Sequence, residues 1–535
     1  MLWPYGTDLR LLDGQLPIGI GALWQLVASP FLAFNLTLAT GTTLNLWAGR
    51  RLGRAFSQRR TVWILTAIAF ATAPSISARL PVHLTMYFAF TAALIVEEAV
   101  RVARGDHAVQ PLRTGLLFVL AYLCDIYYLV FGVIAFFAII LLSGRYDRLT
   151  RVAARGVAAV GVALVLLSPF LVERLHFDNA ERSAGRNPVQ LETAIPSGAD
   201  ALSILAQPSA STLGVPGEGR LREHFRGSLG VAETTIFPGF VLLVALAGLM
   251  LLRTPLRRAL AGSAVLVWIL TLGPSLRLDG RYLFTTSSGS PVAWLPFGAL
   301  IDAPGLANLR AADRGSFTIA AILTAAFALG ITALFETTRR WWHRAAITIV
   351  AGGLLATNLL LPIPVSTLPG SAAVHHALRE VSTRVRPGES LLTVPADCHL
   401  SAGPWQVDLQ ILDRTPRVGC QITPAAIPWQ SGLPLYHTSR ALAALRCDPS
   451  EIGGIQFIPR LGPTPYTDAT ARFRPSDIGI LYRQLGARFL LVDLHQIQQR
   501  RCSRLRPVVP ELLRYDVLGH DRQFIVIDTR ARPGG

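Results

Sequence analysis

The chain has 535 residues, of which 51% are hydrophobic and only 16% are charged, and its mean hydropathy is +0.43. A soluble protein is less apolar, and here the apolar residues form long runs rather than periodic stripes, so we expect a polytopic membrane protein. The net charge of +17 comes from arginines spread over many connections, without the basic, aromatic-interleaved patch of a nucleic-acid interface, which excludes nucleic acid as a partner.

Residues 1–32 are expected to form an exterior N-terminal loop. This loop holds two carboxylates, Asp8 and Asp13, and a semi-apolar stretch at 16–31 that could lie along the membrane interface. One carboxylate near the membrane surface suffices as the general base that deprotonates a hydroxyl acceptor. Both aspartates can equally be ordinary loop residues.

Apolar runs long enough to suggest membrane spans follow, six within 33–172 and four within 236–362. We place them at 33–49, 61–78, 84–102, 113–124, 127–143, 152–172, 236–253, 257–273, 315–335 and 345–362. The fourth run covers roughly 18 Å at 1.5 Å per residue, less than a hydrocarbon core of about 30 Å. We therefore expect a half-span that meets the fifth helix near Asp125.

Asp125 lies between these two apolar helices, beside Tyr127 and Tyr128. A carboxylate at this depth is costly unless it is paired or used, which makes it a candidate site residue. The alternatives are a salt bridge or a helix cap that holds the half-span in place.

The arginines of the connections are concentrated in every second turn. The rich turns are 50–60, 101–113, 145–155, 253–258 and 339–344. Under the positive-inside rule they stay in the cytoplasm. The loops 173–235 and 274–314 and everything after about residue 370 are then extracytoplasmic, in a multi-pass protein of the inner (plasma) membrane. Glu97 and Glu98, near a cytoplasmic end, are expected to pair with Arg101 and Arg104.

Arg310 and Arg314 stand directly before the ninth run, on the expected outer side. Four residues apart at the start of a helix, they should share one face beside the helix N-terminal amides. Such a pair makes an anion site at the level of the lipid headgroups, which fits a lipid phosphate or pyrophosphate. The alternative is two ordinary snorkelling arginines, although the other short turns on this side are poor in arginine.

Residues 371–535 have the alternating pattern of a small extracytoplasmic α/β domain. We expect strands at 390–394, 488–493 and 523–528 and helices at 373–385, 475–485 and 508–513. The domain holds four cysteines, which are Cys398, Cys420, Cys447 and Cys502. Two disulfides with three possible connectivities, or buried free thiols, are both consistent with their spacing, and no metal-ligand pattern is present.

Motifs of nucleotide hydrolysis and of soluble hydrolases are missing from the sequence. Instead, a series of short motifs runs along the chain: Tyr5-Gly6-Thr7-Asp8-Leu9, Ser29-Pro30, Phe34-Asn35-Leu36, Cys124-Asp125-Ile126-Tyr127-Tyr128, Leu295-Pro296-Phe297, Leu309-Arg310 with Arg314, and Leu392-Thr393-Val394-Pro395. The series resembles the bacterial multi-spanning glycosyltransferases of the GT-C superfamily over nearly the whole chain, with motifs that are each short and tolerant.

The resemblance implies a GT-C-like α-helical membrane protein of about ten transmembrane helices with an extracytoplasmic α/β domain. It implies sugar transfer from a polyprenyl-phosphate donor to a cell-envelope glycan or lipid acceptor on the outer face of the membrane. By the same resemblance Asp8 is the base, and Arg310 and Arg314 hold the lipid phosphate. In the hypothesis that follows, Asp125 is a further site residue, which contacts the acceptor or supports a residue that does. No cofactor besides the lipid-linked donor is implied, and the need for a divalent metal stays open.

One departure from the family pattern concerns the N-terminus. Members begin with a cytoplasmic segment and a first span, whereas Met1 falls in what resembles the later part of the first exterior loop. We therefore expect a start codon set too far downstream, or a truncated gene. The main catalytic carboxylate would then be absent, and Asp8 would be a substrate-loop residue.

Two other functions are weighed against glycosyl transfer. The first is a non-catalytic envelope-assembly or lipid-handling membrane protein that retains the GT-C scaffold. The second, secondary transport, is disfavoured because Glu97, Glu98 and Asp125 do not form a chain of buried ionisable groups and no paired broken helices occur in corresponding halves.

Overall fold

The structure is a computed structural model. It describes residues 14–77, 84–144, 149–183, 198–204, 236–252, 254–278, 281–287, 291–301, 309, 311–338, 340–359, 370–394, 417–418, 439–445, 472–498 and 505–530. The chain divides into two compact units. The helical unit comprises Asp13–Asn179 and Asn187–Pro364, and the sheet unit lies mainly within Val365–Gly535.

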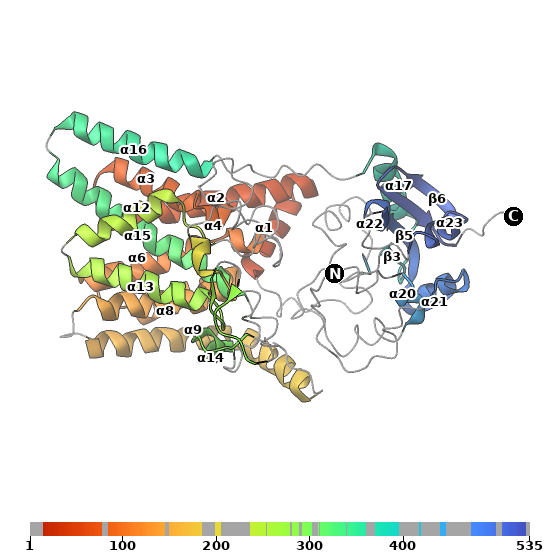
Figure 1. Ribbon diagram of the computed structural model, residues 1–535, viewed down its shortest axis with the longest axis horizontal. Coiled ribbons are helices and arrows are strands. Elements are labelled where there is room, and N and C mark those ends of the chain that lie inside the picture. Colours follow the sequence, from red (N-terminus) through yellow and green to blue (C-terminus); the bar gives the residue numbers. More distant parts are fainter. Residues whose placement is uncertain are drawn as a thin grey trace. The chain divides into compact units, whose positions relative to one another are not determined.

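The helical unit is a bundle whose longer helices run side by side (Figure 1). They are α1 (Gln15–Gln25), α2 (Pro30–Arg54), α3 (Arg60–Ala71), α6 (Phe90–Arg104), α7 (Pro111–Cys124), α8 (Ile126–Leu142), α9 (Leu149–Ser183), α12 (Phe240–Leu251), α13 (Pro255–Thr271), α15 (Ser316–Thr337) and α16 (Trp341–Leu359). Every apolar run expected from the sequence contains one of these helices. Shorter elements are α4 (Pro74–Ser77), α5 (Leu84–Tyr87), α14 (Phe297–Ile301) and the 3-10 turns η3 (Ala201–Ile204) and η4 (Ala312–Gly315).

Two helical segments among the described residues are long and apolar enough to cross a membrane. Thr150–Glu173 has a mean hydropathy of 2.1 and is 22% buried, whereas Ala312–Thr337 has a mean hydropathy of 2.2 and is 78% buried. Four apolar helices are shorter: Arg60–Ala71, Pro111–Cys124, Ile126–Leu142 and Phe240–Met250. Long apolar helices that are buried also occur in the cores of soluble proteins. The exposed apolar segment of α9 is therefore the stronger evidence for a membrane span.

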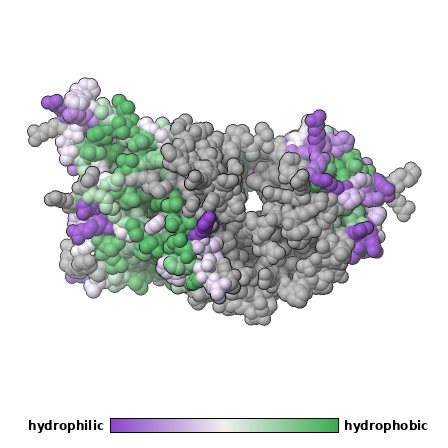
Figure 2. Space-filling model, in the orientation of Figure 1, coloured by the Kyte–Doolittle hydropathy of each residue, from purple (hydrophilic) through white to green (hydrophobic). Residues whose placement is uncertain are grey.

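Large apolar side chains on the outside of the helical unit give it a hydrophobic surface (Figure 2). On α9 they include Val157, Leu164 and Val165, which are 65%, 52% and 71% exposed. On α16 Ile349 and Val350 are 73% and 62% exposed. Contiguous apolar surface of this kind is rare on soluble monomers and is normal where lipid covers the protein.

Several helix boundaries differ from the expectation for local reasons. The second expected run, 61–78, is divided into α3 and α4 because Pro74 has no N–H and its ring is incompatible with a preceding helical turn. α6 ends at Gly105, whose φ of +80° is readily adopted only without a Cβ. α9 continues beyond the apolar run at 152–172. Polar residues end the apolar run there, but they can still adopt a helical backbone.

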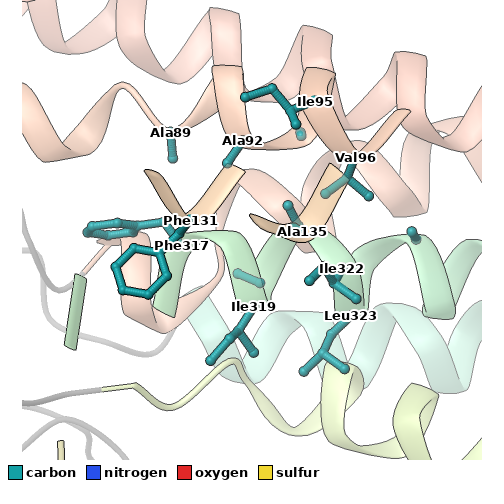
Figure 3. Packing of buried hydrophobic residues seen from close by; sticks show 14 of the residues in the cluster. Ala89, Ala92, Ile95, Val96, Phe131, Ala135, Phe317, Ile319, Ile322 and Leu323 are labelled. Carbon is teal, nitrogen blue, oxygen red and sulfur yellow. The ribbon is translucent and has the colours of Figure 1, made fainter. Parts of the chain in front are cut away.

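The core of the helical unit lies around α15, which packs with α6 and α8. Figure 3 shows side chains of one buried apolar cluster from these three helices, among them Ile95 of α6, Phe131 of α8 and Phe317 of α15. Every residue from Ser316 to Ala328 is buried, so α15 has no solvent-facing stripe over this length.

Buried carboxylates tie α6 to its neighbours at the arginine-rich end of the bundle. Glu97 accepts from Arg51 Nε at 2.8 Å and from Arg101 Nε at 2.9 Å. Glu98 pairs with Arg113 at 3.1 Å and lies 3.6 Å from His107 Nε2. The expected partner Arg101 is confirmed for Glu97.

The predicted pairing of Arg104 with Glu97 or Glu98 is wrong. Arg104 reaches Asp106 at 3.8 Å and donates to the backbone oxygen of Ala55. The sequence offered only the partners within one helical turn, whereas Arg51 and Arg113 come from other helices that pack beside α6.

The sheet unit contains a five-stranded sheet in the order β4-β3-β5-β7-β6. Its strands are β3 (Ser390–Val394), β4 (Arg417–Val418), β5 (Ala487–Asp493), β6 (Asp516–His520) and β7 (Phe524–Asp528). β3 pairs in parallel with β4 and β5, and β7 pairs antiparallel with β5 and β6. The strands expected near β3, β5 and β7 form, whereas β4 and β6 were not expected.

Helices cover both faces of this sheet. They are α17 (Ala372–Arg384), α20 (Arg440–Ala443), α21 (Ser476–Leu485), α22 (Leu494–Gln498) and α23 (Val508–Leu512). α17 packs with Leu391, Phe489 and Leu491 on one face, and α20, α21 and α23 pack on the other. The sheet unit therefore has its own two-sided apolar core.

Arg488 links the ends of β3, β5 and β7 through two acidic partners. Its guanidinium donates to Asp528 at 2.9 and 3.2 Å and to Glu389 at 3.0 Å. Burial alone would raise the pKa of Glu389, but hydrogen bonds from Arg488 and from the Arg386 N–H, with the charges of Arg488 and Arg530, hold that pKa below its ordinary value.

This network predicts an acid-sensitive sheet unit. Because the pKa of Glu389 is lower in the folded than in the unfolded chain, its stabilisation is present at neutral pH and is lost as the pH falls through the folded value. Glu389→Gln should cost about 3 kcal/mol at neutral pH, since it leaves Arg488 with an incomplete set of partners, and it should flatten the acid dependence.

Amide hydrogen exchange of β3 and β5 in the full-length protein measures this effect. Glu511→Gln is the matched control, because Glu511 forms a partly exposed pair with Arg514 on one helix end. Equal exchange rates in Glu389→Gln and in the control across the acid range would contradict the prediction.

Candidate functional site

Asp125 is the residue at which α7 ends and α8 begins. Its backbone is extended, with φ −169° and ψ 138°, and its Oδ1 accepts the Tyr127 N–H at 2.9 Å. The residue is 2% exposed. The helix cap weighed for Asp125 is therefore what the structure shows, and the expected meeting of the short fourth helix with the fifth takes place at this residue.

Tyr127 connects the start of α8 to the segment before α15. Its hydroxyl oxygen accepts the Ala311 N–H at 2.8 Å, and the Arg314 guanidinium carbon lies 4.8 Å from the centroid of its ring. This second distance is that of a cation–π contact, which is stronger at a buried site than in water. One tyrosine thus holds both the backbone and the arginine of this segment.

Arg314 lies in η4 and is only 9% exposed, beside Asp313 at 1%. Its guanidinium is buried against the Tyr127 ring, so it does not extend along the surface as a snorkelling arginine does. Ala311, directly before η4, has φ −98° and ψ 77°, so the helical backbone that carries Arg314 begins after it. The shared helical face expected for Arg310 and Arg314 stays a prediction. Arg310 itself lies outside the described residues.

A second acid–arginine pair, Asp200 and Arg277, was not singled out from the sequence. Arg277 Nε lies 3.8 Å from Asp200 Oδ2, and Arg277 also donates to the Gly198 oxygen at 3.0 Å. Both residues are buried, and they are 77 positions apart, so no local pattern could pair them. The available signal was an arginine directly after an apolar helix on the expected outer side.

Close backbone packing holds these segments together. A Cβ on Gly315 would lie 2.6 Å from Thr271 Cγ2 and 2.7 Å from Phe131 Cε1. The Ala199 N–H donates to the Thr271 oxygen at 2.9 Å. The segments around 125–131, 198–200, 271–277 and 311–315 therefore meet at one end of the helical unit.

We call the polar residues of this region the end cluster, which comprises Asp125, Tyr127, Asp200, Arg277, Asp313 and Arg314. Its two guanidinium groups provide fixed positive charge in a water-poor setting, where the attraction for an anion is stronger than in bulk water. Its three carboxylates outnumber these two guanidinium groups, so an anion would bind to the guanidinium groups themselves and not to a net positive cluster. Among the described residues no group of three or more His, Cys, Asp or Glu side chains could hold a metal ion.

Other residues expected at the site cannot be placed. Asp8 and Asp13 lie outside the described residues, as do Cys398, Cys420, Cys447 and Cys502. Cys124, at the end of α7, is a buried free thiol. The base and the disulfides thus remain expectations from the sequence.

No protein-family model matches the sequence, and no curated protein matches it. Among solved structures, the chain is similar to the arabinofuranosyltransferase AftD from Mycobacteria, with TM-score 0.48 and 15% identity, covering 92% of this chain and 33% of that one. It is also similar to the Archaeoglobus fulgidus oligosaccharyltransferase, with TM-score 0.47 and 12% identity, covering 93% and 63%.

A second structure of the archaeal enzyme, AglB in complex with an inhibitory peptide and a dolichol-phosphate, has TM-score 0.43 and 12% identity over 95% of this chain and 66% of that one. The chain thus spans about a third of AftD and less than two thirds of the archaeal enzyme. At these scores and identities the likeness does not establish a shared fold, so the function is argued from the residues.

The packing at Gly315 predicts that the end cluster tolerates no added methyl group there. Gly315→Ala should destabilise the protein by about 1–3 kcal/mol, because Thr271 or Phe131 must move. Gly330→Ala is the matched control within α15, since a Cβ there meets nothing within 4 Å. Thermal unfolding in detergent measures both variants, and an equal midpoint for the two would contradict the packing argument.

Proposed function

We propose that the protein is an integral membrane glycosyltransferase that moves a sugar from a polyprenyl-phosphate donor to a cell-envelope glycan or lipid acceptor. The reaction would take place on the extracytoplasmic face of the inner (plasma) membrane. The observation that carries the proposal is the end cluster, where buried arginines and carboxylates gather at one end of an apolar helical bundle. The motif series that resembles GT-C glycosyltransferases includes Asp125, Tyr127 and Arg314 of this cluster.

A membrane location is supported by the surface of the helical unit. The apolar side chains on α9 and α16 are exposed, and a bilayer would cover them. α9 also contains a segment of 24 residues with the length and hydropathy of a span.

The direction of α13 indicates on which side of the membrane the end cluster would lie. α13 begins beside Arg257 and Arg258 and ends at Thr271, next to the end cluster. The cluster therefore lies at the end of α13 opposite to its arginines. If arginine-rich turns stay in the cytoplasm, the cluster faces outward.

In the proposed reaction, Arg314 and Arg310 would bind the lipid phosphate. Guanidinium groups match phosphate oxygens in geometry and charge. The acceptor hydroxyl oxygen would form a bond to the anomeric carbon while the bond from that carbon to the phosphate oxygen breaks, with inversion. The bonding pair leaves with the phosphate, where arginines stabilise the growing negative charge.

The hydroxyl proton would go to Asp8. Asp125 would contact the acceptor or orient groups that do, from its position as the cap of α8. The sheet unit would select or position the acceptor glycan, since it has a core of its own and the sequence pattern places it on the same side.

Transfer from a polyprenyl-phosphate sugar in membranes tests the phosphate assignment. Arg314→Ala and Arg310→Ala should each lower transfer by about 100-fold, the effect of removing one group that stabilises transition-state charge. Arg314→Lys should be intermediate, because it keeps the charge but loses the planar fork. The matched control is Arg151→Ala, which removes an exposed arginine near the start of α9.

Full activity in both alanine variants would overturn the role of the arginines. Because Arg314 is buried, the thermal midpoint of each variant must accompany its rate, so that loss of folding is told apart from loss of phosphate binding.

The alternative is a non-catalytic envelope-assembly or lipid-handling protein, which the capping role of Asp125 favours because a cap needs no chemistry. Asp125→Asn separates the two, since Asn caps a helix as well as Asp but carries no charge. Lost transfer at unchanged stability would indicate a chemical role. Intact function in Asp125→Asn and Asp8→Asn, together with loss of function on removal of the sheet unit, would favour the alternative.

A further inference from the structure

An ordered β-hairpin follows α13 at the end of the bundle that carries the end cluster. Its strands β1 (Arg277–Leu278) and β2 (Arg281–Tyr282) are antiparallel. After β2, a separate antiparallel bridge joins Thr285 to Pro291, and we include the described residues up to Leu295 in the hairpin. The Val292 N–H donates to the Phe284 oxygen at 3.0 Å. The backbone of the hairpin is thus held by its own hydrogen bonds.

The hairpin is also fixed to the bundle at its base. The N–H groups of Trp294 and Leu295 both donate to the Pro274 oxygen, at 2.9 and 3.0 Å. Arg277, in the first strand, is anchored by Asp200. The side chains of the hairpin therefore project from a defined position.

Large apolar side chains of this hairpin are exposed although its backbone is ordered. They are Leu278, Leu283, Phe284 and Trp294, which are 38%, 49%, 51% and 53% exposed. The rings of Phe284 and Trp294 meet edge to face, with centroids 5.4 Å apart. Exposure of four large apolar side chains to water on so short a segment is unfavourable.

Along the bundle axis, the hairpin lies at the end of a helix that is about as long as a hydrocarbon core is thick. Its base lies beside η4, because a Cβ on Gly273 would be 3.7 Å from the Ala312 Cβ. α15 starts after η4 and has 22 residues, so it is about 33 Å long, close to the 30 Å of a hydrocarbon core. At its other end Trp341 and Trp342 are 78% and 48% exposed.

Aromatic residues thus occur at both ends of a span-length helix, which is the arrangement of the aromatic belts of membrane proteins. A lipid surface suits the hairpin better than a sugar does. Phe284 and Trp294 do not form a flat platform for a sugar ring, since their planes are 89° apart, and the aliphatic Leu278 and Leu283 offer a sugar no polar contact.

We propose that this hairpin is a membrane-interface anchor, with Leu278, Leu283, Phe284 and Trp294 inserted among the lipid headgroups and the first acyl carbons. The inference rests on the membrane location in the proposed function, but not on glycosyl transfer. The anchor would hold the start of η4, and therefore Arg314, at the level where lipid phosphates lie.

Photo-crosslinking to lipid tests the anchor in the full-length protein. A benzophenone amino acid replaces Phe284 or Trp294, and the protein is placed in nanodiscs of phosphatidylethanolamine and phosphatidylglycerol. Val165, 71% exposed on α9, is the position expected to face lipid chains, and Leu513, 45% exposed in the sheet unit, is the position expected to face water. Lipid adducts at Phe284 and Trp294 should match those at Val165 and exceed those at Leu513 by about tenfold.

The outcomes separate this inference from the proposed function. Adducts at Val165 with none at Phe284 and Trp294 would overturn the anchor and leave the membrane location standing. No adduct at any of the three would overturn both. Adducts to a supplied envelope glycan in place of lipid would also overturn the anchor and would assign the hairpin to acceptor binding.

Discussion

The burial of α15 on all sides is the constraint on which the rest of the helical unit depends. From Ser316 to Ala328 no residue reaches solvent, and the helix packs against α2, α3, α6, α8, α12 and α13. Five of these residues are alanines, which allow neighbouring helices to approach closely. A helix held this way cannot slide or rotate without opening several interfaces. Its first residue, and the η4 turn before it, are therefore fixed in position.

The buried charged residues have different kinds of partners at the two ends of the bundle. At the arginine-rich end Glu97 and Glu98 are surrounded by arginines from other helices, which balances the cost of burying them. At the opposite end Asp125 caps a helix, Arg314 lies on an aromatic ring, and Asp200 meets Arg277 at the longer distance of 3.8 Å. The first arrangement consists of ion pairs that hold neighbouring helices together. In the second arrangement the contacts of the two arginines include an aromatic ring, a backbone oxygen and a carboxylate.

Much of the architecture could be predicted from the sequence because it depends on local hydrophobicity. The apolar runs each contain a helix, and β3, β5 and β7 lie where strand-like runs predicted them. β6 was missed since only two of its five residues, Val517 and Leu518, are apolar, and it is an edge strand that pairs only with β7. The pairing of Arg51 with Glu97, that of Arg113 with Glu98 and the Asp200–Arg277 pair were beyond prediction, because they depend on which helices and loops become neighbours. The helical face expected for Arg310 and Arg314 stays a prediction, because Arg310 lies outside the described residues.

The cap at Asp125 has a consequence for the way the protein enters a membrane. α7 has 14 residues and is about 21 Å long, too short to cross a hydrocarbon core unaided, whereas the 17 residues of α8 are almost wholly apolar. The carboxylate between them bonds to the N–H of Tyr127 in the following helix. In the proposed membrane location, α7 would cross only part of the hydrocarbon core and would depend on its packing against α1, α6 and α8. α7 and α8 would then insert as one hairpin folded at Asp125.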